Sequence, residues 1–236
     1  MPHKLQAVLF DMDGTLVDTE HYWDQSLAGL AERLGGRISA PARAAMVGTN
    51  MRTSLDLLLA DLGLDRTAEQ RTADGVWVLD TTAELMARGV NWRPGALELL
   101  TEVRRAGLAT ALVTTTPRRL ATLVLRHIGQ LADGTTAFDV TVCGDEVAAT
   151  KPDPAPYRQA MAALAVDPVE CVVVEDSVTG VTAGLAAGAA VLGVPSLQPL
   201  QAARGLIVRG SLTDIGVADL EQVLAGRTRV ETTVWS

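Results

Sequence analysis

The sequence predicts an α/β protein, in which an open, doubly wound parallel sheet is interrupted after its first strand by an all-helical insertion. From residue 94 onward, strand-like and helix-like segments alternate, which indicates parallel strands joined by right-handed crossovers. The run CVVV at residues 171–174 is apolar at every position, as in strands covered on both faces. No convincing strand pattern lies between residues 17 and 90, so this block is expected to be helical.

The N-terminal part of the chain contains one predicted strand and four predicted helices. The strand covers residues 5–10, and the helical periodicity begins at residue 18 and first ends at a Gly-Gly pair. The predicted helices are residues 18–34, 41–47, 53–62 and 68–88. We therefore expect a helical cap domain at residues 17–90, inserted into a core domain formed by residues 1–16 and 91–236.

The rest of the chain is expected to complete a Rossmann-like core. The predicted strands are residues 108–114, 138–142, 171–174, 190–194 and 206–208. The predicted helices are residues 94–105, 117–128, 154–164, 177–187 and 217–224. Glycines 180, 184 and 188 are spaced by four, which predicts a helix face that packs closely on the sheet.

Composition excludes several classes of protein. The 236 residues carry a net charge of −8, which argues against a general nucleic-acid or membrane-surface binder. Cys143 and Cys171 provide neither a disulfide framework nor a zinc cluster. Asp11 interrupts the first apolar run, and no apolar segment reaches the ~20 residues that span a bilayer. We expect a cytoplasmic protein that is monomeric or weakly dimeric and has no membrane partner.

Polar side chains follow the predicted strands at the points where ligands bind in open α/β sheets. Asp11 and Asp13 follow the first strand within the segment VLFDMDGTLVDTE. The other strand ends are followed by Thr114, Thr115 and Thr116, by Lys151 in ATKPDP, and by Glu175 and Asp176. These residues are expected to converge on one edge of the sheet.

The charges of these residues predict a metal-assisted reaction on a phosphate. Asp11, Asp176 and Glu175 offer hard oxygen ligands that suit Mg²⁺, and a cation relieves the repulsion between closely spaced carboxylates. The Thr114 hydroxyl and Lys151 can hold a phosphate beside it. An aspartate in line with the phosphorus can attack it and form an aspartyl-phosphate. Asp13 can then protonate the leaving oxygen and later accept a proton from water.

Structural interpretations of the same residues stay open at this point. Thr114 and Thr116 can cap the helix that begins at residue 117, and this is the preferred interpretation of Thr116. Glu175 and Asp176 can cap the following helix, and Asp18 the first helix of the insertion. A calcium loop is disfavoured, because Gly14 and Tyr22 do not match the EF-hand positions. 

The ordered set of DMDGT, Thr114 after a strand, Lys151 in KPDP, and the pair Glu175-Asp176 resembles the four motifs of the haloacid dehalogenase-like (HAD) superfamily. The resemblance covers essentially the whole chain and is nearest to the helical-cap branch of sugar-phosphate phosphatases and β-phosphoglucomutase-like proteins. It implies Asp11 as nucleophile and Asp13 as acid/base. It also implies Thr114 and Lys151 as phosphate holders, and Mg²⁺ bound by Asp11, the Asp13 carbonyl, Glu175 and Asp176.

Two departures from the mutase pattern favour hydrolysis. The β-phosphoglucomutases have a histidine twelve positions after the nucleophile, where this chain has Trp23. They also have a phosphate-binding arginine where this chain has Met51, with Arg52 one position later. The pattern DTExxW at residues 18–23 is more similar to hexose-monophosphate phosphatases of the branch.

We therefore predict a Mg²⁺-dependent phosphatase of a small phosphorylated metabolite, such as a sugar phosphate. The alternatives are a phosphomutase, a haloacid dehalogenase, which Asp13 disfavours, and a non-catalytic phospho-ligand-binding module. Substrate choice is expected to depend on the helical insertion, where packing is the competing interpretation of each candidate. The candidates there are His21, Trp23, Thr49, Asn50 and Arg52.

Overall fold

A computed structural model describes residues 3–46 and 49–227 of the chain. The chain forms two compact units. The core unit comprises Met1–Asp18 and Asn91–Ser236, and the helical unit comprises Thr19–Val90. Among the described helices, none is both long enough and apolar enough to cross a membrane.

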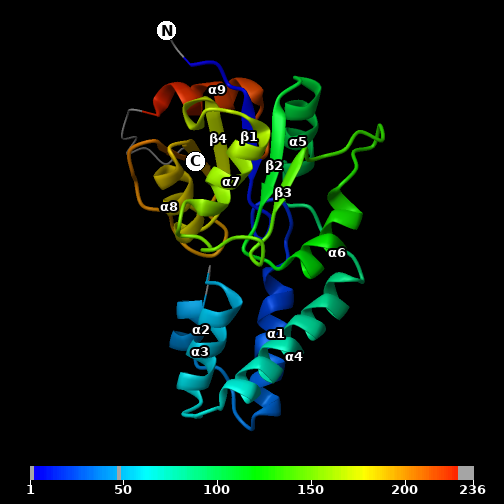
Figure 1. The fold of residues 1–236 in the computed structure, drawn as a ribbon, viewed down its shortest axis with the longest axis vertical. Coiled ribbons are helices and arrows are strands. Elements are labelled where there is room, and N and C mark those ends of the chain that lie inside the picture. Colours follow the sequence, from blue (N-terminus) through cyan, green and yellow to red (C-terminus); the bar gives the residue numbers. More distant parts are fainter. Residues whose placement is uncertain (1–2, 47–48, 228–236) are drawn as a thin grey trace. The chain divides into compact units, whose positions relative to one another are not determined.

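The core unit contains a six-stranded, all-parallel sheet with the order β3-β2-β1-β4-β5-β6 (Figure 1). The strands are β1 (Ala7–Phe10), β2 (Ala109–Val113), β3 (Val140–Val142), β4 (Cys171–Glu175), β5 (Ala190–Gly193) and β6 (Leu206–Val208). From the centre of the sheet, β1, β2 and β3 follow one another toward one edge, and β4, β5 and β6 toward the other. The order reverses between β1 and β4, which are neighbours in the sheet. In open α/β sheets a crevice for ligands opens at such a point.

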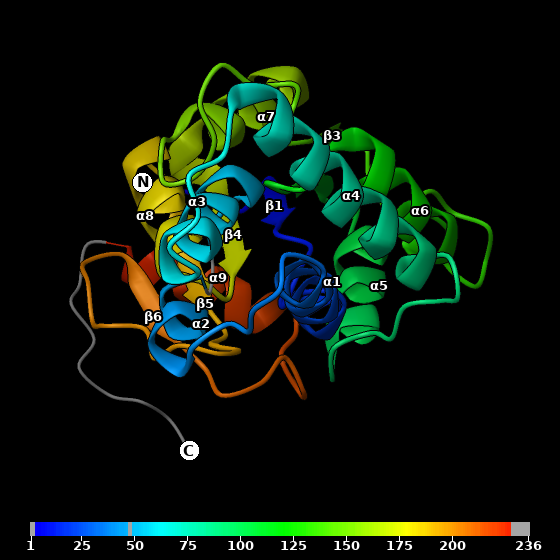
Figure 2. The same ribbon diagram turned by 90° about the horizontal axis from the view of Figure 1, so that it is seen from below.

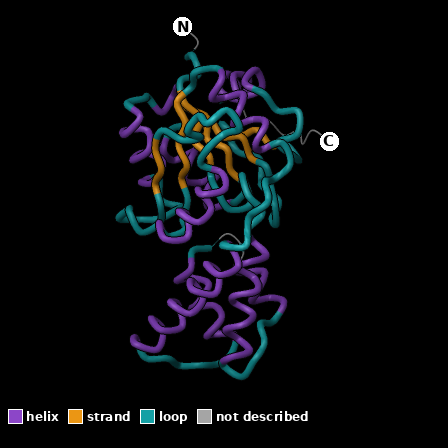
Figure 3. Tube along the Cα trace, turned by 90° about the vertical axis from the view of Figure 1, so that its right-hand side faces the viewer, coloured by secondary structure: helices purple, strands orange, loops and turns teal. Residues whose placement is uncertain are grey.

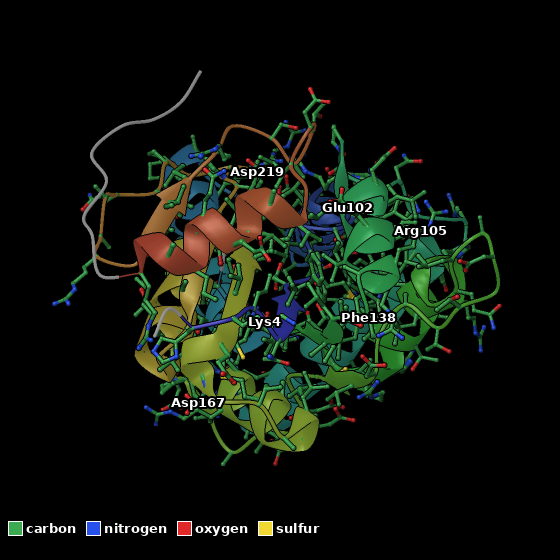
Figure 4. The ribbon with its side chains drawn as sticks, turned by 90° about the horizontal axis from the view of Figure 1, so that it is seen from above. Lys4, Glu102, Arg105, Phe138, Asp167 and Asp219 are labelled. Atoms are coloured by element: carbon green, nitrogen blue, oxygen red, sulfur yellow. The ribbon has the colours of Figure 1, made fainter. Side chains whose placement is uncertain are left out.

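Helices cover both faces of this sheet. The helices are α5 (Ala96–Arg105), α6 (Arg118–Ile128), α7 (Ala155–Leu164), α8 (Val178–Ala187) and α9 (Val217–Gly226). Helices α7 and α8 pack on one face, where they meet the odd-numbered residues of the central strands, such as Leu9 and Val173. Helices α5 and α9 contact each other and lie on the opposite side of the strands (Figure 4). Because both faces are covered, the central strands are apolar throughout.

The predicted elements of the core are present, with local differences at their ends. Helix α5 begins at Ala96 and not at residue 94, since Gly95 takes a left-handed conformation (φ 80°) at the N-cap. Strand β3 begins at Val140, two residues later than predicted, and at Asp139 it is the side chain that accepts a hydrogen bond from the Thr110 N–H (2.8 Å). A short 3-10 helix, Pro168–Glu170, was not predicted.

Two glycines of α8 and the glycine that ends it are each required for a different structural reason. Gly184 lies where a Cβ would press on Val173 and Val191 at 3.1 Å, so the helix packs closely on the sheet as expected. A Cβ at Gly180 would overlap the Glu175 carboxylate. Gly188 is the left-handed C-cap of the helix (φ 98°). The four-residue spacing therefore combines packing, room for an acidic side chain, and helix termination.

The described residues of the helical unit form helices and loops without a strand (Figures 2 and 3). The helices are α1 (Glu20–Arg33), α2 (Ala40–Met46), α3 (Met51–Asp61) and α4 (Ala68–Met86). Residue 47, the predicted end of the second helix, lies outside the described residues. Leucines of α1 and α3, with Val78 of α4, form the apolar core of the unit.

Two polar contacts lie inside the helical unit. The Thr82 hydroxyl of α4 donates to the Ser26 hydroxyl of α1 (2.8 Å), and both side chains are fully buried. The Arg66 guanidinium donates twice to Asp74, through Nε to Oδ2 (2.9 Å) and through Nη2 to Oδ1 (2.8 Å). Asp74 is only 5% exposed, so this ion pair satisfies a carboxylate that has little access to water.

The two connections to the helical unit run side by side within the core unit. The Asp18 N–H donates to the Asn91 carbonyl (2.9 Å), and the Arg93 N–H donates to the Leu16 carbonyl (2.8 Å). Val17 and Trp92 form an antiparallel bridge between them. Asp18 does not cap the first helix, because the N-cap position of α1 is Thr19.

Candidate active site

The candidate site is built on the carboxyl ends of β1 and β4, at the reversal of strand order. Asp11 follows β1 directly, and Glu175 is the last residue of β4. The Asp11 N–H donates to the Val174 carbonyl (3.0 Å), so the sheet ladder itself holds the two acidic segments side by side. The parallel pairing of β1 with β4 in this register therefore brings the carboxylates of Asp11 and Glu175 next to each other.

Lys151 lies in the middle of the acidic residues. Its Nζ donates to Asp11 Oδ1 (2.6 Å), to Glu175 Oε1 (2.6 Å) and to the Val113 carbonyl (2.8 Å). An ammonium has three N–H donors, so all three are used. Lys151 is only 5% exposed, although the loop after β3 that carries it is at the surface. A buried charge of this kind is tolerated because it is paired and hydrogen-bonded.

Burial and charge act in opposite directions on these groups. Burial raises the pKa of Asp11 to about 7, although the nearby Lys151 ammonium acts to lower it. Burial also disfavours the Lys151 ammonium, but attraction to Asp11 and Glu175 outweighs it and raises the pKa of Lys151 above its ordinary value. Lys151 is therefore charged at neutral pH and favours the ionised form of Asp11 beside it.

Glu175 is held by donors on both oxygens. Its Oε1 accepts from Lys151 and from the Tyr157 hydroxyl of α7 (2.7 Å). Its Oε2 accepts from the Ser177 hydroxyl (3.1 Å) and the Asp176 N–H (3.2 Å). Burial and the nearby Glu175 raise the pKa of Tyr157 well above its ordinary value, so the phenol keeps the proton that it donates.

Asp176 is oriented by two hydroxyl groups from other elements. The Thr15 hydroxyl donates to Asp176 Oδ1 (3.4 Å), and the Ser196 hydroxyl donates to Asp176 Oδ2. Neither Glu175 nor Asp176 caps α8, because Ser177 takes that position and accepts from the Gly180 N–H (3.1 Å). The capping alternative for these two acids is therefore wrong.

Asp13 contacts the threonines that follow β2. Its Oδ2 accepts from the Thr116 hydroxyl (2.7 Å) and from the Thr114 hydroxyl (3.2 Å). The preferred capping interpretation of Thr116 is wrong: Pro117 is the N-cap residue of α6, and the first N–H of this helix, that of Arg118, donates to Asp145 Oδ1 (2.8 Å). Thr115 is half-buried, and its carbonyl leaves no room for a Cβ at Gly144. All the predicted residues of the core unit thus gather at these strand ends.

The acidic cluster has the properties of a divalent-cation site. Asp11, Glu175 and Asp176 each offer a carboxylate oxygen, and these oxygens lie within 4.8 Å of one another. Asp11 Oδ2 is buried without a hydrogen-bond partner. Three carboxylates against one ammonium leave the cluster negative, and hard oxygen ligands suit Mg²⁺ or a similar cation. The residues therefore fit a metal ion, with Asp11 Oδ2 as the oxygen most in need of one.

The predicted residues of the helical unit have mixed surroundings. Trp23 packs against the apolar core of the unit. The Thr49 hydroxyl donates to the Met46 carbonyl (2.8 Å), and the Asn50 side chain caps α3 by accepting from the Thr53 N–H (3.0 Å). His21 stacks at a tilt on Tyr22, with ring centroids 3.9 Å apart, and Arg52 is exposed. 

The sequence does not predict a role in the site for five of its residues: Thr15, Tyr157, Ser177, Ser196 and, as a partner of Asp13, Thr116. Ser196 follows β5, so the rule that located the other strand-end residues also points to it. Thr15 lies within DGT, next to Asp13, and its contact with Asp176 is 161 residues away in the sequence. Tyr157 lies on α7, where its aromatic ring reads as an ordinary core residue and only the fold reveals its hydroxyl contact.

Comparison with known proteins identifies the family. The model of haloacid dehalogenase-like hydrolases matches residues 5–188. The phosphorylated carbohydrates phosphatase of Thermotoga maritima is 33% identical over 184 residues, which cover 78% of this chain and 82% of that protein. Hexitol phosphatase B of Escherichia coli K12 is 28% identical over 223 residues, which cover 93% of this chain and 98% of that protein.

A solved structure agrees with this assignment. CbbY from Rhodobacter sphaeroides, crystallised with phosphate, has a TM-score of 0.81 and 28% sequence identity, covering 92% of this chain and 99% of that one. The shared fold agrees with the family match, which covers residues 5–188 and so includes Asp11, Lys151 and Asp176. The chain belongs to the haloacid dehalogenase-like hydrolases.

Proposed function

We propose that this chain is a Mg²⁺-dependent phosphatase that hydrolyses a small sugar phosphate through an aspartyl-phosphate on Asp11. The observation that carries the proposal is the buried contact of Lys151 with Asp11 and Glu175, next to Asp176. It combines a carboxylate nucleophile, a fixed cation and a place for a metal ion. The similarity to phosphatases named for phosphorylated carbohydrates and hexitols supports the substrate class.

In this proposal the chain holds the phosphate with Lys151 and the loop after β2. One of the three Lys151 N–H donors turns from its present acceptor to a phosphate oxygen. The Thr114 hydroxyl and the backbone at Thr115 supply neutral donors on another side of the phosphorus. Charge on the transferred phosphoryl group is thereby stabilised by groups that are already fixed before the reaction.

The metal would be held chiefly by Asp11 and Asp176. Asp11 Oδ2 and the Asp176 carboxylate would be the side-chain ligands. The Asp13 carbonyl would be a third protein oxygen, as the family resemblance implies. Glu175 lies in the same cluster, but its oxygens already accept from Lys151, Tyr157 and Ser177, so it serves mainly to hold Lys151. When bound, Mg²⁺ supplies charge neutralisation between the nucleophile and the anionic phosphate.

Two carboxylates divide the chemistry. Asp11 attacks the phosphorus, and as the bond to the sugar oxygen breaks, that oxygen takes a proton from Asp13. Asp13, now a carboxylate, then takes a proton from water while the water oxygen attacks the phosphorus. The products are inorganic phosphate and the original Asp11 carboxylate. Lys151 remains protonated throughout, because its two acidic neighbours raise its pKa.

We further propose that the helical unit acts as the cap that selects the substrate, with His21, Thr49, Asn50 and Arg52 as its candidate contacts. Arg52 is exposed on α3 and brings a positive charge that suits an anionic metabolite. Thr49 and Asn50 already have partners that shape the start of α3, so their contribution includes holding that helix end.

Inorganic phosphate release tests the proposal. Hexitol phosphates and hexose phosphates are incubated with the protein, with Mg²⁺ or with EDTA. We expect phosphate release from at least one compound, and loss of that release when EDTA removes the metal. An isomerised sugar phosphate without phosphate release would indicate a mutase, and release that persists in EDTA would contradict the metal requirement.

Asp11→Asn tests the nucleophile. The change keeps the shape of the side chain but removes the charge that attacks phosphorus, so turnover should fall below detection while circular dichroism is unchanged. Asp65→Asn, an exposed aspartate of the helical unit, is the matched control and should retain wild-type turnover. Retained activity in Asp11→Asn would exclude Asp11 as the nucleophile.

A further inference from the structure

Asp13 accepts hydrogen bonds from the hydroxyl groups of two threonines. Thr116 Oγ1 donates to Asp13 Oδ2 at 2.7 Å, and Thr114 Oγ1 donates to the same oxygen at 3.2 Å. Both threonines are buried, Thr114 with 1% and Thr116 with 4% of its surface exposed. A hydroxyl has one proton, so each can serve one acceptor at a time.

Thr116 is fixed by its backbone on both sides. Its N–H donates to Thr114 Oγ1 (3.0 Å), and its carbonyl accepts from the Gly144 N–H (3.1 Å) in the loop that leads to Lys151. The next residue, Pro117, is the N-cap of α6. The hydroxyl of Thr116 therefore projects from a rigid turn, and it donates to Asp13 instead of capping α6.

The two contacts have different fates in the proposed reaction. Thr114 is expected to donate its single hydroxyl proton to the substrate phosphate. Its hydrogen bond to Asp13 is then lost. The contact with Thr116 has no such competitor in the proposed reaction. Thr116 is thus the residue that can hold Asp13 while the phosphate is bound.

We propose that Thr116 is the positioning residue of the general acid. This rests on the proposed function, in which Asp13 gives its proton to the leaving oxygen. Because Oδ2 accepts the Thr116 hydrogen bond, the proton of the acid form is favoured on Oδ1. The proton moves from Asp13 Oδ1 to the sugar oxygen as the phosphorus–oxygen bond breaks and the bond from Asp11 to phosphorus forms. Thr116 fixes which carboxyl oxygen is presented for that transfer.

Leaving-group dependence separates this role from a general structural one. Phenyl phosphate and 4-nitrophenyl phosphate are nearly the same shape, but phenolate needs protonation much more than 4-nitrophenolate does. Thr116→Val removes the hydroxyl and keeps the volume. Since general acid catalysis contributes ~10²–10⁴-fold, we expect kcat/KM for phenyl phosphate to fall about 10- to 100-fold, and that for 4-nitrophenyl phosphate to fall only a few-fold.

Three further variants complete the test. Thr116→Ser keeps the hydroxyl and should recover most of the activity on phenyl phosphate. Thr114→Val should lower kcat/KM for both esters alike, because both share the phosphate that Thr114 is proposed to hold. Thr122→Val removes an exposed hydroxyl of α6 that donates to the Arg118 carbonyl (2.8 Å), and should leave both values unchanged.

The outcomes are distinguishable from failure of the proposed function. If the wild-type protein releases phosphate from neither ester nor any sugar phosphate, the proposed function fails. If it is active and Thr116→Val lowers both esters equally, or Thr116→Ser does not recover activity, the positioning role of Thr116 is overturned. Should Thr116→Val not fold, by circular dichroism, Thr116→Ala replaces it in the same comparison.

Discussion

Neutral hydroxyl groups orient the carboxylates of the candidate site. The donors are Thr15 and Ser196 for Asp176, Tyr157 and Ser177 for Glu175, and Thr114 and Thr116 for Asp13. A hydroxyl satisfies a buried carboxylate oxygen without adding positive charge. The cluster is therefore ordered but stays negative, apart from Lys151, and this keeps its attraction for a divalent cation.

Gly14 tests how closely the first loop approaches the proposed metal ligands. Its φ is 84°, and a Cβ there would overlap the Asp176 carboxylate. Gly14→Ala should therefore displace Asp176 and weaken Mg²⁺ binding by about tenfold, or ~1.4 kcal/mol, as measured by isothermal titration calorimetry. 

Gly35→Ala is the matched control for this change. Gly35 has nearly the same φ, 87°, but no atom within 4 Å of a Cβ. Both variants carry the strain of a left-handed alanine, ~1–2 kcal/mol, and only the new Cβ of Gly14→Ala meets the Asp176 carboxylate. Equal Mg²⁺ affinity in the two variants would show that Asp176 does not bind the ion.

Tyr157 makes a buried hydrogen bond to a charged acceptor. Tyr157→Phe removes one donor from Glu175 and should lower the free energy of unfolding by ~1.5–3 kcal/mol, measured by urea denaturation. Tyr22→Phe is the comparison, because the Tyr22 hydroxyl donates to the neutral Gly89 carbonyl at 2.8 Å. That variant should lose only ~0.5–1.5 kcal/mol. A Tyr157→Phe protein as stable as the wild type would mean that Glu175 finds another donor.

At the scale of elements, the site depends on where strands end and helices begin. Asp11 and Glu175 come together because β1 and β4 pair in parallel, with Phe10 opposite Val174. The turn after β2 presents Thr114 and Thr116 to Asp13, and α6 begins after Pro117, with its first N–H donated to Asp145 and not to either threonine. Strand register thus fixes Asp11 and Glu175, while the turn before α6 supplies the hydroxyl donors of Asp13.

In the helical unit, the two partners of the Arg66–Asp74 ion pair differ in burial, so removal of one partner should cost more stability than removal of the other. Arg66→Ala leaves the Asp74 carboxylate, 5% exposed, without its guanidinium, whereas Asp74→Ala leaves an arginine whose side chain is 23% exposed and can turn to water. Arg66→Ala should destabilise the protein by ~3–5 kcal/mol, and Asp74→Ala by clearly less. Thermal unfolding followed by circular dichroism measures both, and the reverse order would contradict the burial argument.

At the scale of the whole molecule, the sequence was sufficient for the fold class and the family. Alternating strand and helix patterns from residue 94 onward and the helical block before it predicted the observed elements, and the family resemblance is confirmed. Apolar periodicity is a local property, so it survives in the sequence without knowledge of tertiary contacts.

Side-chain partners were less predictable, for a physical reason. A threonine before a helix can cap it or bond elsewhere, and the choice depends on acceptors that are distant in sequence. Thr116 bonds to Asp13, 103 residues away, so local sequence favoured the wrong partner. The same holds for Tyr157, whose acceptor Glu175 lies on a different element.

Metal binding should be visible in the stability of the molecule. A ligand that binds only the folded state stabilises it by ~2.7 kcal/mol at 100 times its Kd. We expect Mg²⁺ to raise the melting temperature of the wild-type protein and to have little effect on Asp176→Asn. Differential scanning fluorimetry with increasing Mg²⁺ measures this, and an equal shift in both proteins would place the ion elsewhere.

The paired connections at Asp18–Asn91 and Leu16–Arg93 give the chain a modular character. The insertion leaves and re-enters the core at hydrogen-bonded neighbours, so its length and sequence impose no strain on β1 or α5. Evolution can enlarge, trim or exchange this segment while the catalytic machinery keeps its geometry. If this segment selects the substrate, as proposed, new substrate ranges can arise by change of this one insertion, without redesign of the strand ends that carry the acidic residues.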